Sequence, residues 1–100
     1  MARDYDFWVY MMTNKHETVL YIGLTNDLAR RVYEHRSGEI PGFTADYCCK
    51  HLIYYEHHSD VHQAIDREKQ LKRWSRVKKV ALVARMDPRW VDLGPEVLEQ

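Results

Sequence analysis

A carboxylate interrupts the apolar stripe of a predicted helix, and it is the first candidate for chemistry in this sequence. Apolar residues recur at helical spacing after Asp60, and the next expected member of the stripe is position 68, which is Glu68. The apolar members are Val61, Ala64, Ile65 and Leu71. A carboxylate facing a core costs free energy unless it is paired or ligates a cation. Glu68 is therefore either a cation ligand or one half of an ion pair, with Lys72 or Arg31, that only stabilises helices.

An arginine and a histidine occur together on an earlier predicted helix. Leu28 and Val32 are four residues apart and mark the buried side of this helix. Arg31 and His35 have the same spacing, so their side chains project together beside the buried stripe. This placement makes both residues candidates for one site.

Three strands and three helices must position these side chains. Short apolar and β-branched runs predict strands at Phe7–Met12, Thr18–Gly23 and His51–His57. Helical patterns predict helices from Leu28 to near Ser37, from Val61 to about Trp74 and from Arg76 to Arg85. The order strand, strand, helix, strand, helix, helix indicates an α+β fold with a small three-stranded, mainly antiparallel sheet flanked by helices.

Capping residues support the predicted helix ends. Thr25–Asp27 offers side chains that can cap the first helix, and Gly38 supplies the left-handed residue after it. Ser59 or Asp60 can cap the second helix, and a break near Ser75 separates the last two.

Length and composition limit what the chain can be. The 100 residues allow one domain, residues 1–100, with a core at about 7–86 and a short C-terminal tail at 87–100. The apolar runs are too short to span a bilayer, and the N-terminus lacks the apolar region of a secretory signal. Two adjacent cysteines, Cys48 and Cys49, in a predicted exposed loop at 39–50 form no disulfide framework. We therefore expect a reduced, cytoplasmic protein with no membrane partner.

The charges are unevenly distributed, although 15 basic and 15 acidic residues cancel. Residues 67–89 contain nine basic and two acidic side chains, a local charge of +7. Such a segment can contact several phosphates of a nucleic acid. The alternative is a helix surface that merely carries solvated lysines and arginines.

Two tyrosines in the predicted strands connect these candidates. Isolated strand tyrosines usually pack in a core. Here the motifs follow one another in the order Val9-Tyr10, Tyr21-Ile22-Gly23, Asn26–Arg31, His35 and Arg67-Glu68. In this order and spacing the sequence resembles the GIY-YIG nuclease superfamily over roughly residues 7–86. Trp8 stands where the signature has its first Gly, and Leu24 stands where the excision-repair members carry lysine.

The resemblance implies a small stand-alone bacterial protein similar to the N-terminal nuclease domain of excision-repair incision enzymes. It implies an endonuclease that hydrolyses phosphodiester bonds in DNA, with branched, damaged and single-stranded forms as candidate substrates and RNA as a further candidate. It also implies one divalent cation, Mg²⁺ or Mn²⁺, and it indicates no obligate protein partner. The family's catalytic positions fall on Tyr10, Tyr21, Arg31, His35 and Glu68. We expect nucleic acid to contact the basic residues Arg30, Arg73, Arg76, Lys78 and Lys79.

The residue types fit the roles that the resemblance implies. A single carboxylate, here Glu68, can seat Mg²⁺, because this ion keeps most of its own water. Arg31 would pair with the non-bridging oxygens of the phosphate in the transition state. Tyr21 would activate the attacking water, with Tyr10 and His35 orienting it or sharing its proton.

Two other functions remain open from the sequence. The first is a non-catalytic nucleic-acid-binding module of the same fold, which is expected if the chain has no extension that supplies sequence specificity. The second is a protein-interaction domain whose basic segment contacts an acidic partner.

Overall fold

Three antiparallel strands form the centre of the protein. The computed structural model describes residues 5–38 and 48–99, and the following statements concern these residues. The strands are β1 (Phe7–Thr13), β2 (Leu20–Thr25) and β3 (His51–His58). Their order in the sheet is β2-β1-β3, and both neighbours of β1 are antiparallel to it. This arrangement confirms the predicted α+β fold with a three-stranded antiparallel sheet.

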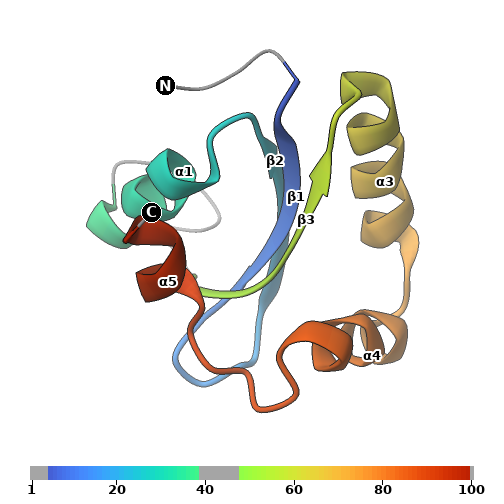
Figure 1. Ribbon diagram of the computed structural model, residues 1–100. Coiled ribbons are helices and arrows are strands. Elements are labelled where there is room, and N and C mark those ends of the chain that lie inside the picture. Colours follow the sequence, from blue (N-terminus) through green and yellow to red (C-terminus); the bar gives the residue numbers. More distant parts are fainter. Residues whose placement is uncertain (1–4, 39–47, 100) are drawn as a thin grey trace.

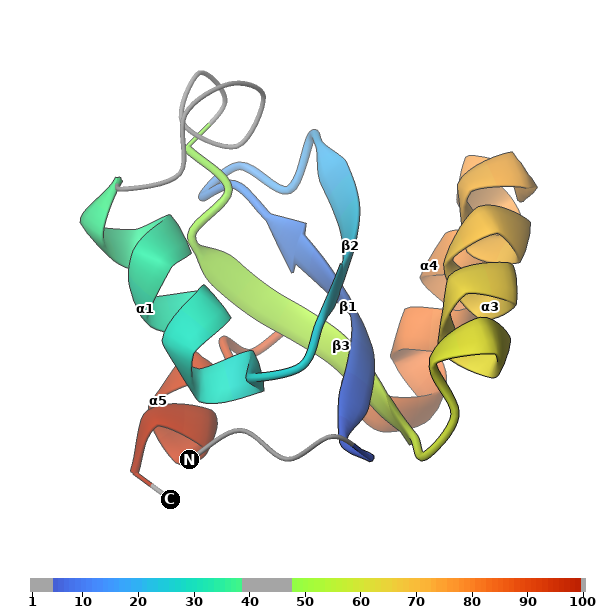
Figure 2. The same ribbon diagram turned by 90° about the horizontal axis from the view of Figure 1, so that it is seen from above.

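Helices cover both faces of the sheet, as Figures 1 and 2 show. The helices α1 (Leu28–Ser37) and α5 (Gly94–Leu98) lie on one face, and α3 (Val61–Arg73) and α4 (Arg76–Met86) lie on the other. Side chains of β1 alternate between the two sides, as expected for a strand buried on both faces. Val9 and Met11 join the core under α3 and α4, whereas Tyr10 and Met12 join the core under α1 and α5.

The predicted caps of α1 and α3 are confirmed, and Ser75, expected only as a break between two helices, caps α4. The Asp27 carboxylate accepts a hydrogen bond from the Arg30 backbone N–H at 3.1 Å, and Gly38 has a left-handed backbone with φ of 76°. Asp60 caps α3 through the His62 N–H at 2.8 Å, and Ser75 caps α4 through the Lys78 N–H at 3.3 Å. These caps form because short polar side chains satisfy the free N–H groups of a first turn.

The C-terminal residues, expected to form a short tail, contribute to the core. Val97 of α5 is 5% exposed and packs in the cluster that contains Tyr10. Asp92 holds this segment in place, because its Oδ1 accepts hydrogen bonds from the backbone N–H groups of Leu52 (3.1 Å) and Gly94 (2.9 Å). Its other oxygen pairs with Arg36 of α1.

Two further expectations differ from the structure or fall outside it. Val61 was expected in the buried stripe but is 36% exposed, because it is the first residue of α3 and burial begins one turn later at Ala64. Most of the loop expected at 39–50 lies outside the described residues, which resume at the exposed Cys48 and the buried Cys49. Within the described ranges, no helix has the length and apolar character needed to cross a membrane.

Candidate active site

Three of the predicted site residues are in mutual contact on the α1 side of the sheet. Tyr10 comes from the central strand, Tyr21 from the edge strand β2 and His35 from the last turn of α1. The ring centroids are 6.2 Å apart for the two tyrosines, 5.7 Å for Tyr10 and His35, and 5.5 Å for Tyr21 and His35. The Tyr10 hydroxyl oxygen lies 3.0 Å from His35 Nε2. The fold therefore brings together two phenols and an imidazole from three separate elements.

Gly23 makes room for this cluster. Gly23 pairs with Tyr10 across the two strands, and the Tyr10 ring lies over it. A methyl group added at Gly23 would lie 2.8 Å from Tyr10 Cε1 and closer still to Cζ and the hydroxyl oxygen. Any larger residue at this position would displace the ring, so the glycine of the Tyr21-Ile22-Gly23 motif has a steric reason here.

The environment of the cluster keeps both Tyr10 and His35 uncharged near neutral pH. Burial, together with the nearby phenol of Tyr21, raises the pKa of Tyr10 well above its usual value. A hydrogen bond with Tyr21 raises it further. Burial and the positive charge of Arg31 lower the pKa of His35 to about 4. At pH 7 the pair is thus a protonated phenol against a neutral imidazole.

Arg31 lies at the border of the cluster. Its charge acts on both Tyr10 and His35, lowering the pKa of each. Its side chain is 37% exposed, and its Nε is 3.4 Å from a carboxylate oxygen of Glu34 in the next turn. A guanidinium in this position is accessible to an anion from solvent.

Glu68 approaches from the other layer of the protein. It lies on α3, which covers the opposite face of the sheet but contacts β2 at the sheet edge. Its negative charge contributes to the raised pKa of Tyr10. Its side chain is 20% exposed, and one carboxylate oxygen is 3.6 Å from Lys72 Nζ. The ion pair expected as the structural alternative is therefore present, while the carboxylate still acts on the tyrosine cluster.

A basic depression adjoins the cluster at the edge of the sheet. It encloses about 280 Å³, and its lining residues are Leu20, Tyr21, Ile22, Lys72 and Lys79. Two lysines beside one tyrosine of the cluster create a positive potential where a phosphate would have to approach.

The residues expected to bind nucleic acid are spread over several surfaces. Arg30 is 74% exposed in its side chain and pairs with Glu34 at 3.4 Å. Arg76 donates to the backbone carbonyl of Glu17 at 2.8 Å, on the turn between β1 and β2. Lys79 lines the depression beside Tyr21. Arg73 and Lys78 instead lie near Trp74, farther along α3 and α4.

A polar cluster centred on Glu56 was missed by sequence reasoning. The Arg67 Nε donates to both Glu56 oxygens, at 3.0 and 3.2 Å, and the Tyr54 hydroxyl donates to Oε1 at 2.5 Å. His58 Nε2 lies 2.5 Å from the other oxygen. Burial opposes ionisation of Glu56, but these hydrogen bonds outweigh it and hold its pKa below the usual value. Only the alternation of polar residues along β3 hinted at this cluster.

The comparisons with known proteins decide the family. The model of the GIY-YIG catalytic domain matches residues 6–81. The chain belongs to the GIY-YIG family. This GIY-YIG domain is 38% identical over 79 residues to a UPF0213 protein of Natronomonas pharaonis, covering 79% of this chain and 92% of that protein. It is 35% identical over 79 residues to a UPF0213 protein of Haloquadratum walsbyi, covering 79% and 86%.

A solved structure agrees with the fold of this GIY-YIG domain. The solution NMR structure of a UPF0213 protein from Bacillus halodurans matches with a TM-score of 0.56 and 27% identity. The match covers 85% of this chain and 89% of the other. The family predicted from the motifs is thus confirmed, together with its fold.

The GIY-YIG family implies a divalent cation, and the residues present fit one. No group of three His, Cys, Asp or Glu residues suited to a metal occurs in the described part of the chain. Protein side chains alone therefore do not complete the coordination of a metal ion among the described residues. Glu68 is a partly exposed carboxylate with one long ion pair, to Lys72. One such carboxylate is sufficient for Mg²⁺, which retains waters and shares phosphate oxygens.

Proposed function

We propose that this GIY-YIG domain hydrolyses phosphodiester bonds in DNA. The observation that carries the proposal is the contact of Tyr10, Tyr21 and His35, with the charges of Arg31 and Glu68 acting on Tyr10. Packing in a core does not require a cation and a carboxylate at the border of the cluster, because charged groups cost free energy when they are taken out of water. The basic depression beside Tyr21 supports the approach of a phosphate to this cluster.

The histidine and the tyrosines form a chain of hydrogen bonds that ends at Tyr21. With its ring hydrogen assigned to Nε2, neutral His35 donates to the Tyr10 oxygen, and Tyr10 donates to Tyr21. Tyr10 keeps its proton, because its pKa is raised. Tyr21, which receives this hydrogen bond, acts in this proposal as its phenolate, and its oxygen accepts a proton from the attacking water. The water oxygen then bonds to phosphorus, the bond from phosphorus to the leaving sugar oxygen breaks, and that oxygen takes up a proton from solvent.

Charged residues stabilise the negative charge that this step concentrates on the phosphate. Arg31 is exposed enough to pair with the non-bridging oxygens. Glu68 would hold Mg²⁺ or Mn²⁺, which when bound supplies a Lewis acid for the phosphoryl and leaving oxygens.

Basic residues outside the cluster bind the phosphate backbone in this proposal. Arg30, Arg73, Arg76, Lys78 and Lys79 remain the proposed contacts. The substrates are branched, damaged or single-stranded DNA in the cytoplasm, where such a nuclease serves DNA repair. RNA belongs in the same test.

A cleavage assay tests the proposal directly. Plasmid, flap, fork and single-stranded DNA, and an RNA of matched sequence, are incubated with the protein in Mg²⁺, Mn²⁺ or a chelator. We expect cleavage of at least one DNA that requires the cation. The Glu68→Gln variant should lose cleavage but keep DNA affinity, because it removes only the cation ligand and a charge repelled by phosphate. Glu99→Gln, the same change on an exposed residue of the C-terminal segment, is the control and should cleave normally.

A second pair of variants tests the tyrosine cluster. Tyr10→Phe removes the hydroxyl that contacts His35, and we expect it to lower the cleavage rate by about 10²- to 10⁴-fold. Tyr55→Phe is the matched control, because Tyr55 lies opposite Tyr10 on β3 and its hydroxyl donates to Glu96 at 3.3 Å, away from the cluster.

The result also separates the rival function. Arg31 and Glu68 each have a partner within the protein, Glu34 and Lys72, which is what a non-catalytic binding module would need. DNA binding without cleavage of any substrate in the panel would establish that module and refute the nuclease.

A further inference from the structure

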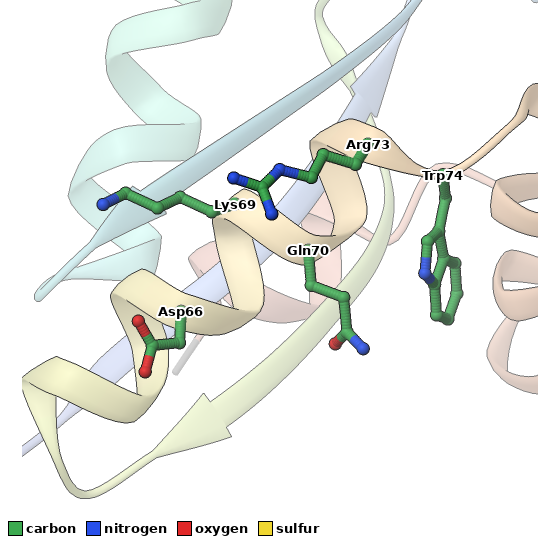
Figure 3. Close-up of a pocket in the computed structure, with 5 residues that line it drawn as sticks. All are labelled: Asp66, Lys69, Gln70, Arg73 and Trp74. Carbon is green, nitrogen blue, oxygen red and sulfur yellow. The ribbon is translucent and has the colours of Figure 1, made fainter.

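Trp74 occupies an unusual position at the junction of α3 and α4. Its ring is only partly buried, packing against the core on one side and bordering solvent on the other. Two separate surface depressions share this one side chain. Figure 3 shows that the indole of Trp74 projects from the segment between the two helices and lies at one end of the first depression.

Both depressions are lined by cations. The first encloses about 500 Å³, and its lining residues are Asp66, Lys69, Gln70, Arg73 and Trp74. The second encloses about 310 Å³, and its lining residues are Trp74, Lys78, Ala81, Leu82 and Arg85. Each therefore has two basic side chains, all four of them exposed, and Asp66 is the single acid in either lining. In such an arrangement an unpaired base can stack on the aromatic ring while the phosphates on either side of that base contact the cations.

The two cations nearest the ring are held differently. The Arg67 guanidinium carbon lies 5.2 Å from the Trp74 ring centroid, and Arg67 is anchored by Glu56 and by Gln70 at 2.8 Å. Lys78 Nζ lies 5.8 Å from the same centroid, and no ion pair holds it within the described residues. Arg67 thus fixes the ring, whereas Lys78 is able to move from the ring to a phosphate.

This surface lies across one helix from the candidate active site. Glu68 and Arg73 are five residues apart on α3, which places them about 140° apart around the helix axis. Since a helix is only about 10 Å thick, a strand crossing α3 would contact both sides. Lys69 lies between them around the helix axis, about 100° from Glu68, and lines the first depression.

We propose that Trp74 stacks an unpaired base of single-stranded DNA, with Lys69 and Arg73 on one side and Lys78 and Arg85 on the other binding the adjacent phosphates. This inference rests on the proposed nuclease function and specifies its substrate class as DNA with an unpaired segment next to the cleaved bond. It also gives a role to a partly buried tryptophan that borders two depressions lined by exposed cations.

The experiment compares two ligands on the wild-type protein, so it does not depend on the folding of a variant. Fluorescein-labelled oligothymidylate and an abasic strand of the same length and charge are titrated in a chelator, which suppresses cleavage. We expect the abasic strand to bind roughly 5- to 150-fold more weakly, because it keeps the phosphates but has no base to stack. Equal affinities would overturn the proposal by showing that binding is electrostatic alone.

Tryptophan signals locate the site. The three indole N–H resonances are assigned by Trp→Phe variants. On addition of oligothymidylate, the resonance of Trp74 should shift more than those of the other two tryptophans. The abasic strand should shift the Trp74 resonance much less than oligothymidylate does. A larger shift for Trp8 or Trp90 would place the base elsewhere and refute the assignment. Trp74→Leu should approach the abasic affinity while Trp74→Phe retains most of it; if the leucine variant does not fold, the two wild-type measurements still decide.

Charge variants test the phosphate contacts. Neutralising Lys69, Arg73, Lys78 or Arg85 should each lower the slope of log affinity against log salt by about 0.7. Arg89→Gln, outside both depressions, should leave the slope unchanged. Displacement of the DNA by polyglutamate at equal charge concentration would instead indicate an acidic protein partner and overturn the proposal.

These measurements are separable from the nuclease test. Cleavage without discrimination between the two strands would refute stacking at Trp74 and leave the nuclease intact. Discrimination without cleavage of any substrate would refute the nuclease and leave a single-strand-binding surface.

Discussion

Acidification should destabilise this protein through one buried histidine. His35 is 4% exposed, and burial together with the charge of Arg31 lowers its pKa to about 4. In the unfolded chain the same imidazole has an ordinary pKa of about 6.5. Between these two pKa values the imidazole is protonated in the unfolded state but neutral in the folded state. The protein therefore loses stability as the pH falls from about 6.5 to about 4.

The size of the loss follows from the two pKa values. A shift of this extent corresponds to about 3.4 kcal/mol when fully developed. The loss should be about 1.4 kcal/mol at pH 5.5 and about 3 kcal/mol at pH 4, relative to pH 7.5. Above about pH 8 the imidazole is neutral in both states and contributes almost no pH dependence.

Urea unfolding at pH 7.5, 5.5 and 4 measures this loss. The control is His35→Gln, which keeps a polar group near Tyr10 but does not titrate. Protonation of carboxylates such as Glu56 lowers the stability of both proteins to the same extent. The difference between the two unfolding free energies therefore isolates the contribution of His35. We expect that difference to change by about 3 kcal/mol between pH 7.5 and pH 4. The claim that His35 is buried and neutral would be refuted if the unfolding free energies of the two proteins changed in parallel with pH and the imidazole titrated near 6.5 by NMR.

Three other changes have expected outcomes. Gly23→Ala should lower the unfolding free energy by about 1–3 kcal/mol, because the added methyl collides with the buried Tyr10 ring; thermal unfolding should show a loss of roughly 4–8 °C per kcal/mol, and an unchanged melting temperature would contradict the steric argument. Arg31→Ala should lower turnover far more than DNA affinity, because its pairing with the phosphate strengthens in the transition state; equal losses of kcat/KM and affinity would make Arg31 a binding residue only. Glu56→Gln should cost about 1–3 kcal/mol, because Arg67 is left partly buried without its charged partner, and a cost near zero in urea unfolding would show the cluster to be a weak surface pair.

Much of the fold could be predicted because its signals are local. The capping side chains of Asp27, Asp60 and Ser75 and the left-handed Gly38 act within a few residues of each helix end. The strands were expected from short apolar runs, and their observed bounds differ from the expected ones by only one or two residues. Val61 was assigned wrongly because periodicity along a helix does not reveal where its packing partner begins.

The candidate site could be predicted only as a set of residues. The order of the motifs along the chain indicates one site made of Tyr10, Tyr21, Arg31, His35 and Glu68, and the catalytic roles of these residues stay predictions. No local pattern could state which pairs touch.

The sequence by itself determined the three strands, the helices α1, α3 and α4, the caps of α1 and α3, and the family resemblance, because hydrophobic period and capping chemistry depend on neighbours along the chain. The tertiary structure alone decided that His35 is neutral, since its burial and its contact with Tyr10 depend on residues 25 positions apart. It likewise decided that Asp92 holds the C-terminal segment against α1 and that Trp74 borders two basic depressions. Burial and electrostatic environment are properties of the packed molecule, because every layer around a group changes the solvent it has lost and the charges it faces.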